Sequence, residues 1–175
     1  MKKEKKARAI VKKLIQLSPI LVNAMEVRVP WKVCLKIFRQ NKEKVAQYEE
    51  GKRGRSALHV AAIVSAPNTF LMELMKVFPP KALLPKDNDG RTPLALSVKY
   101  GASSSNVVTI LKTNKTAISI MDKDGNSPLH LYLQRGKIID HTVLEVLIKA
   151  NRSMLAKRNI AGDVPIQVAI NYSAT

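Results

Sequence analysis

The sequence predicts an all-α fold in which a helix-turn-helix unit repeats along the chain. The first observation is a short phrase that recurs at 54–59 (GRSALH), 90–95 (GRTPLA), 125–130 (GNSPLH) and, more loosely, 162–167 (GDVPIQ). Its glycines are 36, 35 and 37 residues apart, and a fixed period of roughly 20 to 50 residues is typical of stacked arrays. The second observation is that no stretch supplies the alternating strands of a βαβ sheet.

Each position of the phrase has a physical role at the start of a helix. Two copies are preceded by Asp-x-Asp, at 87–89 and 122–124. Aspartate bonds its own backbone in turns, and glycine permits a positive φ. The following Ser or Thr can cap a helix, and proline fits the first helical position, where its missing N–H would be unpaired anyway. The phrase therefore predicts a turn followed by the first helix of each unit.

A second, longer helix is predicted in each unit. Apolar-rich segments align in one column at 31–38, 70–78, 107–111 and 143–148. Pro30 and Pro67 are expected to open two of them, and a helix-stopping residue follows each segment: Asn41, Pro79, Asn114 and Asn151. An extended return to the next turn is expected after each stop. Neither helix can bury its apolar face alone, so the units are expected to stack.

The phrase resembles the signature of the ankyrin repeat family, whose best-known string is T-P-L-H-x-A. Residues 54–62 (GRSALHVAA) are the closest match. The periods are longer than the family's roughly 33 residues, and four residues depart from the string: Ala57, Ala95, Val164 and Gln167. The resemblance implies an ankyrin-like helix-turn-helix solenoid with turn or β-hairpin tips. Its units are expected at about 18–53, 54–89, 90–124, 125–161 and, as a partial unit, 162–175.

The chain is strongly basic, above all before the array. Its formal net charge is +17 at pH 7, and residues 1–53 hold 15 Lys or Arg against 5 Glu. Residues 1–17 are predicted to form a basic amphipathic helix, because Ile10, Leu14 and Leu17 lie on one stripe. We interpret this helix as a cap on the first unit. A nuclear-import signal or an anionic-surface tag is an alternative, and a mitochondrial targeting helix is disfavoured because such segments avoid acids.

No catalytic, metal or cofactor site is predicted, so an enzyme is not expected. The scattered histidines and the lone cysteine form no metal-ligand spacing, and the acidic turns lack the distal glutamate of an EF-hand. No phosphate-cradling loop or nucleophile–base pattern is present in the sequence. The resemblance implies that His59 and His130 are structural, with Ser56 and Ser127 as their partners. Cys34 is expected to be a small core residue.

The chain is expected to be intracellular, in the cytoplasm or the nucleus. Its single cysteine cannot form an intramolecular disulfide and fits a reducing compartment. No apolar run approaches the roughly 18 residues of a membrane span, so a transmembrane protein is not expected. No small-molecule ligand is predicted.

The predicted function is a non-catalytic module that binds another protein. In ankyrin arrays partners usually bind the concave side, which is made from the turn tips and the exposed ends of the first helices. Carried over by position, the resemblance implies these partner-binding residues: Arg55, Ile63, Arg91, Lys99, Tyr100, Asn126, Gln134, Arg135, Asn171 and Tyr172. Tyr and Arg are enriched in binding hot spots, and Tyr100, Arg135 and Tyr172 can form a ladder. The alternative is that these residues are only solvated helix ends.

Two other functions stay open on the sequence alone. The first is charge-driven binding of nucleic acid or an anionic membrane, with weak polyanion binding through the Lys-rich N-terminus. The interleaving of aromatic and basic residues typical of nucleic-acid modules is absent. The second is a recruiting arm of a larger enzyme, with a catalytic domain expected beyond Thr175. The last unit is expected to stop after its first helix, as a fragment of a longer array or with a partner covering that end. There, Val168, Ala169 and Ile170 are expected to have little cover.

Overall fold

The computed structural model describes residues 20–42, 54–77, 85–136 and 139–173, and this part of the chain is mostly helical. No β-strand is formed within these ranges. The prediction of an all-α protein is therefore confirmed for the described residues. The predicted helix at 1–17 and the predicted stop at Pro79 lie outside them.

The helices alternate along the chain between a first and a second helix of each unit. The first helices are α2 (Ile20–Glu26), α5 (Ala57–Ile63), α7 (Pro93–Tyr100), α9 (Pro128–Leu133) and α11 (Pro165–Ser173). The second helices are α3 (Trp31–Gln40), α6 (Asn68–Val77), α8 (Ser104–Thr113) and α10 (His141–Ala150). All of these helices except α2 lie where the phrase or the apolar column places them.

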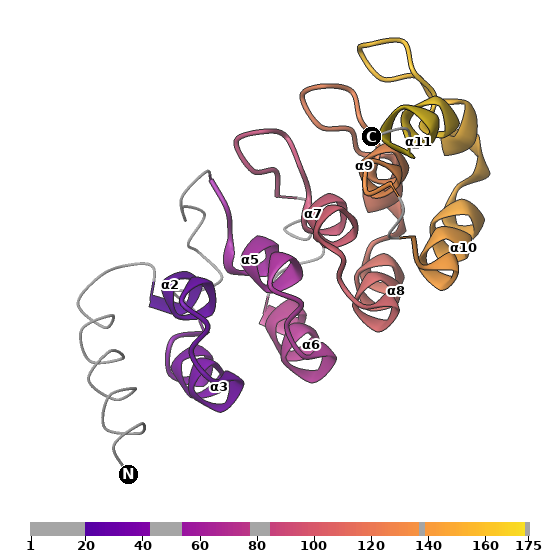
Figure 1. The fold of residues 1–175 in the computed structure, drawn as a ribbon. Helices are drawn as coiled ribbons and strands as arrows, with labels where there is room; N and C mark the ends of the chain where they lie inside the picture. Colours follow the sequence, from indigo (N-terminus) through magenta and orange to yellow (C-terminus); the bar gives the residue numbers. More distant parts are fainter. Residues whose placement is uncertain (1–19, 43–53, 78–84, 137–138, 174–175) are drawn as a thin grey trace.

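Figure 1 shows the helix pairs side by side, with the first helices in one row and the second helices in another. Along the first row, α5 contacts α7, α7 contacts α9 and α9 contacts α11. Along the second row, α3 contacts α6, α6 contacts α8 and α8 contacts α10. The loops that lead into α7, α9 and α11 project beyond the first row as a series of tips. The core therefore lies between the two rows.

The first helices begin as the phrase predicts. The Thr92 hydroxyl accepts a hydrogen bond from the Ala95 N–H at 3.3 Å, and the Ser127 hydroxyl accepts one from the His130 N–H at 3.4 Å. Proline occupies the first turn of both helices. Each cap satisfies a backbone donor that has no partner inside its helix.

The tips are tight turns organised by an aspartate. The Asp87 Oδ1 atom accepts hydrogen bonds from the N–H groups of Asp89 (3.0 Å) and Arg91 (2.9 Å). The Gly90 N–H donates to the Asp87 carbonyl at 2.8 Å, with a Gly90 φ of 79°. The tip at Asp122 repeats the pattern, and its Gly125 has a φ of 74°. The prediction of positive-φ glycines is confirmed.

The two return segments that the structure describes, after α8 and α10, differ from the prediction, because they begin as 3-10 helices rather than as extended chain. These are η2 (Lys115–Ser119) and η3 (Arg152–Ala156). The Asn114 side chain accepts a hydrogen bond from the Thr116 N–H at 3.0 Å, and the Asn151 side chain accepts one from the Ser153 N–H at 3.1 Å. Asparagine thus ends one helix and starts the next turn.

The last helix is better covered than the sequence suggests. Val168 is only 3% exposed, because α11 packs against both α9 and η3. The expectation that Val168 lacks cover is therefore wrong. Ile170, on the other side of the same helix, is 60% exposed.

Candidate partner-binding surface

The first helices are buried along most of their length and reach solvent at their C-terminal ends. In α7 every residue from Pro93 to Val98 is buried, whereas Tyr100 is 46% exposed. In α9 every residue is buried, and the two residues that follow it are partly exposed. Solvent therefore reaches these helices where the sequence places the partner-binding pairs. We call this row the helix-end surface; it comprises Ile63, Lys99, Tyr100, Gln134, Arg135, Asn171 and Tyr172.

Residues of the helix-end surface in one unit lie against a glycine of the unit before it. A Cβ atom on Gly101 would lie 2.6 Å from Nη2 of Arg135, so the guanidinium occupies the space that the glycine leaves open. Arg135 thereby lies over the C-terminal end of α7, where the helix dipole favours a cation. A Cβ atom on Gly136 would lie 2.8 Å from the Tyr172 carbonyl oxygen. The structure therefore brings Arg135 beside the residue that follows Tyr100, and Tyr172 beside the residue that follows Arg135.

Arg135 also has a rigid aromatic support. Its Cζ atom lies 5.7 Å from the centre of the Tyr132 ring, within the range of a cation–π contact. Tyr132 is fully buried, and its hydroxyl accepts the Asp140 N–H at 2.6 Å and donates to the Asp140 carbonyl at 2.7 Å. Burial raises the pKa of Tyr132, so it stays a neutral donor. These bonds hold Asp140, the N-cap of α10, against the ring that Arg135 contacts.

The tip residues of the predicted site are not open contacts. Arg91 is only 7% exposed and forms ion pairs with Asp87, at 3.0 Å, and with Asp89. Asn126 is 6% exposed and accepts a hydrogen bond from Asn159 Nδ2 of the next tip at 3.0 Å. Both side chains bond to polar groups inside the tips, so the structure leaves little of either side chain accessible to a partner.

The Arg55 side chain, the third predicted contact at the tips, is largely but not fully buried. Its side chain is 13% exposed, and its Nε atom lies 3.6 Å from Oδ2 of the buried Asp87 in the next tip. Most of its guanidinium therefore faces the neighbouring unit rather than an incoming protein.

The two histidines of the phrase are structural, as predicted. The His59 Nδ1 atom accepts the Ser56 N–H at 3.0 Å and lies 2.9 Å from the Ser56 hydroxyl, while Nε2 lies 3.1 Å from the Arg91 carbonyl. Because Nδ1 must accept from a backbone N–H, the ring proton resides on Nε2 and is donated to that carbonyl. His130 repeats the arrangement, with Nε2 3.1 Å from the Asp163 carbonyl.

Burial keeps both rings neutral. Desolvation lowers the pKa of His59 to about 4, although the Arg91 carbonyl and the Asp87 carboxylate act in the opposite direction. Desolvation also lowers the pKa of His130. In the last unit Gln167 replaces histidine, and its Oε1 atom accepts the Val164 N–H at 2.9 Å. The sequence shows that substitution but not its role as a backbone acceptor.

Cys34 is a core residue, as predicted. It is fully buried, and its thiol donates to the Val29 carbonyl at 3.4 Å. Burial raises its pKa to about 11, so the group is a thiol rather than a reactive thiolate at neutral pH.

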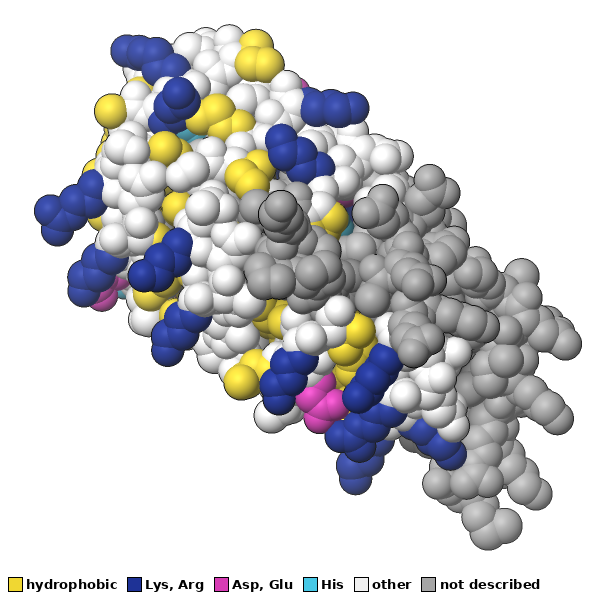
Figure 2. Space-filling model, turned by 180° about the vertical axis from the view of Figure 1, so that it is seen from behind, with side chains coloured by type: hydrophobic (Ala, Val, Ile, Leu, Met, Phe, Trp, Pro, Cys, Tyr) yellow, Lys and Arg dark blue, Asp and Glu magenta, His cyan; other side chains and the backbone are white. Residues whose placement is uncertain are grey.

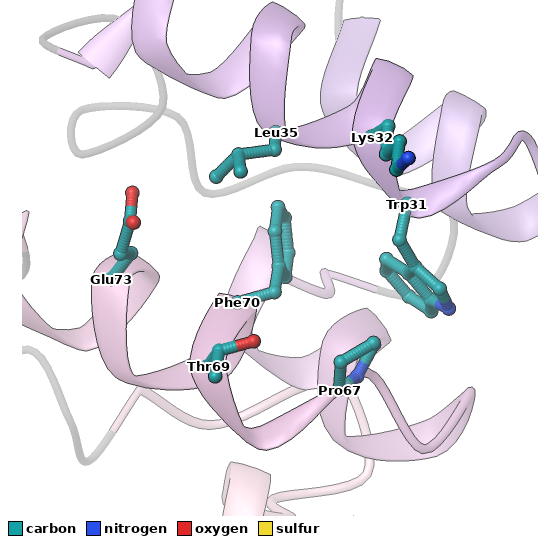
Figure 3. Close-up of a pocket in the computed structure, with 7 residues that line it drawn as sticks. All are labelled: Trp31, Lys32, Leu35, Pro67, Thr69, Phe70 and Glu73. Carbon is teal, nitrogen blue, oxygen red and sulfur yellow. The ribbon is translucent and has the colours of Figure 1, made fainter.

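A groove between α3 and α6 is a feature that the sequence reasoning missed. Trp31, Leu35 and Phe70 are among the residues that line it (Figure 3). The sequence pattern predicted only that the apolar residues of both helices pack against neighbouring units. The sequence signal that could have indicated the groove is Trp31, the single tryptophan of the chain. It is the first residue of α3 and is partly exposed.

Neither a metal cluster nor a membrane-spanning helix is found among the residues that the structure describes. They contain no group of three or more His, Cys, Asp or Glu side chains placed to hold a metal ion. None of their helices has the length and apolar content needed to cross a membrane. No protein-family model matches the chain, and no curated protein matches it significantly.

Proposed function

We propose that the chain is a non-catalytic, ankyrin-like repeat array that binds a partner protein through the helix-end surface. The array part of this proposal is supported by hydrogen bonds that cross from one unit to the next at the tips. The Lys123 N–H donates to the Asp89 carbonyl at 2.9 Å, and the Ile160 N–H donates to the Asp124 carbonyl at 3.0 Å. Together with the histidine bonds, they link each tip to its neighbour, as the hairpin-like tips of a solenoid would require.

The observation that carries the binding proposal is an alignment of Tyr and Arg side chains on rigid helix ends. Tyr100 is 46% exposed and Tyr172 is 51% exposed, and the structure brings Arg135 against the backbone that follows Tyr100. Large side chains held on buried helices lose little conformational entropy when a partner binds. Tyr and Arg are also the residue types that dominate interface energies.

The test is a titration of the partner recovered by affinity capture and mass spectrometry. Tyr100→Ala and Arg135→Ala should each weaken that complex by about 1 kcal/mol or more, roughly fivefold in Kd. Tyr100→Ala should change thermal stability little, because its side chain is exposed. Arg135→Ala also loses the contact with the Tyr132 ring, so its affinity is compared at a temperature at which circular dichroism shows it folded. Lys149→Ala and Lys157→Ala are the controls, since both lysines are exposed and lie off the helix-end surface. Equal losses for all four variants would contradict the proposal and indicate diffuse electrostatics.

Charge-driven binding of polyanions is a second candidate, favoured by the net charge of +17. Affinity for heparin or duplex DNA should be weak, should lack sequence preference, and should fall steeply as salt rises. Deletion of residues 1–6, which include four lysines, should remove much of this binding. A tight, salt-insensitive and sequence-selective DNA complex would instead indicate a specific nucleic-acid site.

A further inference from the structure

The groove between α3 and α6 lies on the second-helix row, away from the helix-end surface. It has a volume of 230 Å³ and is lined by Trp31, Lys32, Leu35, Pro67, Thr69, Phe70 and Glu73. Figure 3 shows Trp31, Leu35 and Phe70 projecting into the space between the two helices, with Lys32 and Glu73 at its edges. The groove is therefore apolar inside and charged at the rim.

Two aromatic rings form a fixed floor. The ring centres of Trp31 and Phe70 are 5.3 Å apart, and Phe70 in turn packs against the buried Phe38 at 6.0 Å. Phe70 is only 4% exposed, whereas Trp31 and Leu35 stay partly open to water. The floor is thus anchored in the core, while apolar surface above it has no cover within the described residues.

The size of the groove selects the kind of occupant. Small-molecule sites usually enclose roughly 300–1,000 Å³, and 230 Å³ is below that range. A single large apolar side chain fits such a volume better than a cofactor does. Apolar or aromatic anchors that fill small pockets of this kind are typical hot spots of protein interfaces.

The charge around the groove selects the chemistry of the flanking residues. From Trp31 to Lys42 the described chain carries no carboxylate and four exposed cations: Lys32, Lys36, Arg39 and Lys42. On the opposite wall, Glu73 is paired with Arg39 at 3.0 Å, and this hydrogen bond lowers the pKa of Glu73. Figure 2 shows Lys and Arg side chains beside hydrophobic ones on the face of the molecule opposite to that in Figure 1. A complementary segment is therefore acidic.

We propose that this groove binds an acidic peptide segment of a partner protein by accepting one of its large apolar side chains. The aromatic floor supplies the pocket, and the cations of α3 attract the flanking carboxylates. This site is distinct from the helix-end surface, so the two can be occupied independently.

The native tryptophan supplies the experiment, because Trp31 is the only one in the chain and lines the groove. The probe is a dodecapeptide of Asp, Glu and Ser with one central Phe, titrated against the full chain while tryptophan emission is followed. We expect a saturable change in emission, with affinity about tenfold higher than for the same peptide carrying Ser in place of Phe. Binding should weaken as salt rises.

Variants locate the site. Thr69→Phe should fill the groove and abolish binding of the Phe peptide, and Lys32→Glu should weaken it about fivefold or more. Lys112→Glu makes the same change of charge on an exposed face of α8, and it should alter affinity by less than about twofold. Circular dichroism melts verify that each variant is folded. Tyr100→Ala should leave this binding unchanged, which separates the groove from the helix-end surface.

Several outcomes would overturn the proposal. Equal affinities for the Phe and Ser peptides would show that charge alone binds them. Equal losses of peptide affinity in Lys32→Glu and Lys112→Glu would show that the peptide does not bind at α3. Binding detected by calorimetry without any change in tryptophan emission would place the peptide elsewhere.

Discussion

A single histidine joins two units because its two ring nitrogens serve different partners. In His59, Nδ1 accepts the N–H of its own helix cap, and Nε2 reaches the Arg91 carbonyl of the next tip. Protonation of Nδ1 would set two donors against each other inside a buried site. The residue is therefore a structural link whose strength depends on pH.

Stability should fall in acid as these histidines are forced to accept protons. The pKa of His59 is about 4 in the folded chain and roughly 6.5 when unfolded. The unfolded state therefore binds more protons between these values, and stability is lost as pH falls from about 6.5 towards 4. His59 alone should contribute a loss on the order of 3 kcal/mol, with His130 acting in the same direction. Urea unfolding across this range measures the effect.

The matched control replaces the titrating ring by an amide. His59→Gln with His130→Gln should flatten this pH dependence, because Gln167 already provides the cap acceptor in the last unit. An unchanged slope in the double variant would assign the pH dependence to other groups.

Alanine substitutions at two tip glycines distinguish the cost of backbone strain from the cost of disturbing the contact between neighbouring tips. Gly125 has a φ of 74° and Gly162 a φ of 87°, so alanine is strained at both. Only at Gly125 does a Cβ atom meet backbone, 2.9 Å from the Ile160 nitrogen of the next tip; at Gly162 nothing lies within 4 Å. Gly125→Ala should therefore destabilise by about 1 kcal/mol more than Gly162→Ala, which itself costs about 1 kcal/mol. Equal losses in denaturant unfolding would show that the tips do not press on each other.

At the scale of elements, side-chain hydrogen bonds connect α8 to the start of α6 and the loop before it. Asn106, near the start of α8, is 1% exposed and donates to the Ala66 carbonyl, just before α6, at 2.8 Å. Thr109 of the same helix donates to Asn68 Oδ1 at 2.8 Å. These bonds fix how one unit lies on the next.

Removal of the buried amide should be costly. Asn106→Ala leaves the Ala66 carbonyl without this donor, so we expect a loss of about 1–3 kcal/mol in unfolding free energy. Thr113→Ala, at the exposed end of the same helix, should change stability by less than about 0.5 kcal/mol. Similar values for both variants, measured by chemical denaturation, would mean that the Asn106 bond does not hold the units together.

Helix starts could be predicted from the sequence because their chemistry is local. A Ser or Thr cap directly followed by proline marks the starts of α7 and α9, as at Thr92 and Pro93. The 3-10 returns were missed because Asn114 and Asn151 were treated only as stops. Their bonds to Thr116 and Ser153 use a side-chain acceptor that an Asn-x-Thr or Asn-x-Ser spacing can indicate.

At the scale of the whole molecule, site residues were predictable only where exposure follows from position within one unit. Tyr100 is such a case, since it ends a helix whose other turns are buried. Asn126 is not, because its burial depends on Asn159 of the next tip. The groove at Trp31 and Phe70 likewise depends on how two units are spaced, which no single repeat encodes.

The two proposed sites lie on different rows of helices. The helix-end surface belongs to the first helices and the groove to the second helices α3 and α6. Because each row is anchored in the same core, both sites are held rigidly without sharing a contact residue. A partner could therefore engage one row while another segment occupies the other.

Amide hydrogen exchange at the tips tests the stacking of units most directly. Lys123 and Ile160 have exposed side chains, yet their N–H groups donate to carbonyls of the preceding tip, Asp89 and Asp124. If units stack as described, these two amides should exchange at least about 100-fold more slowly than in an unstructured chain. Exchange at unprotected rates, while the Leu131 amide inside α9 stays protected, would show folded helices without stacked units and would contradict the account.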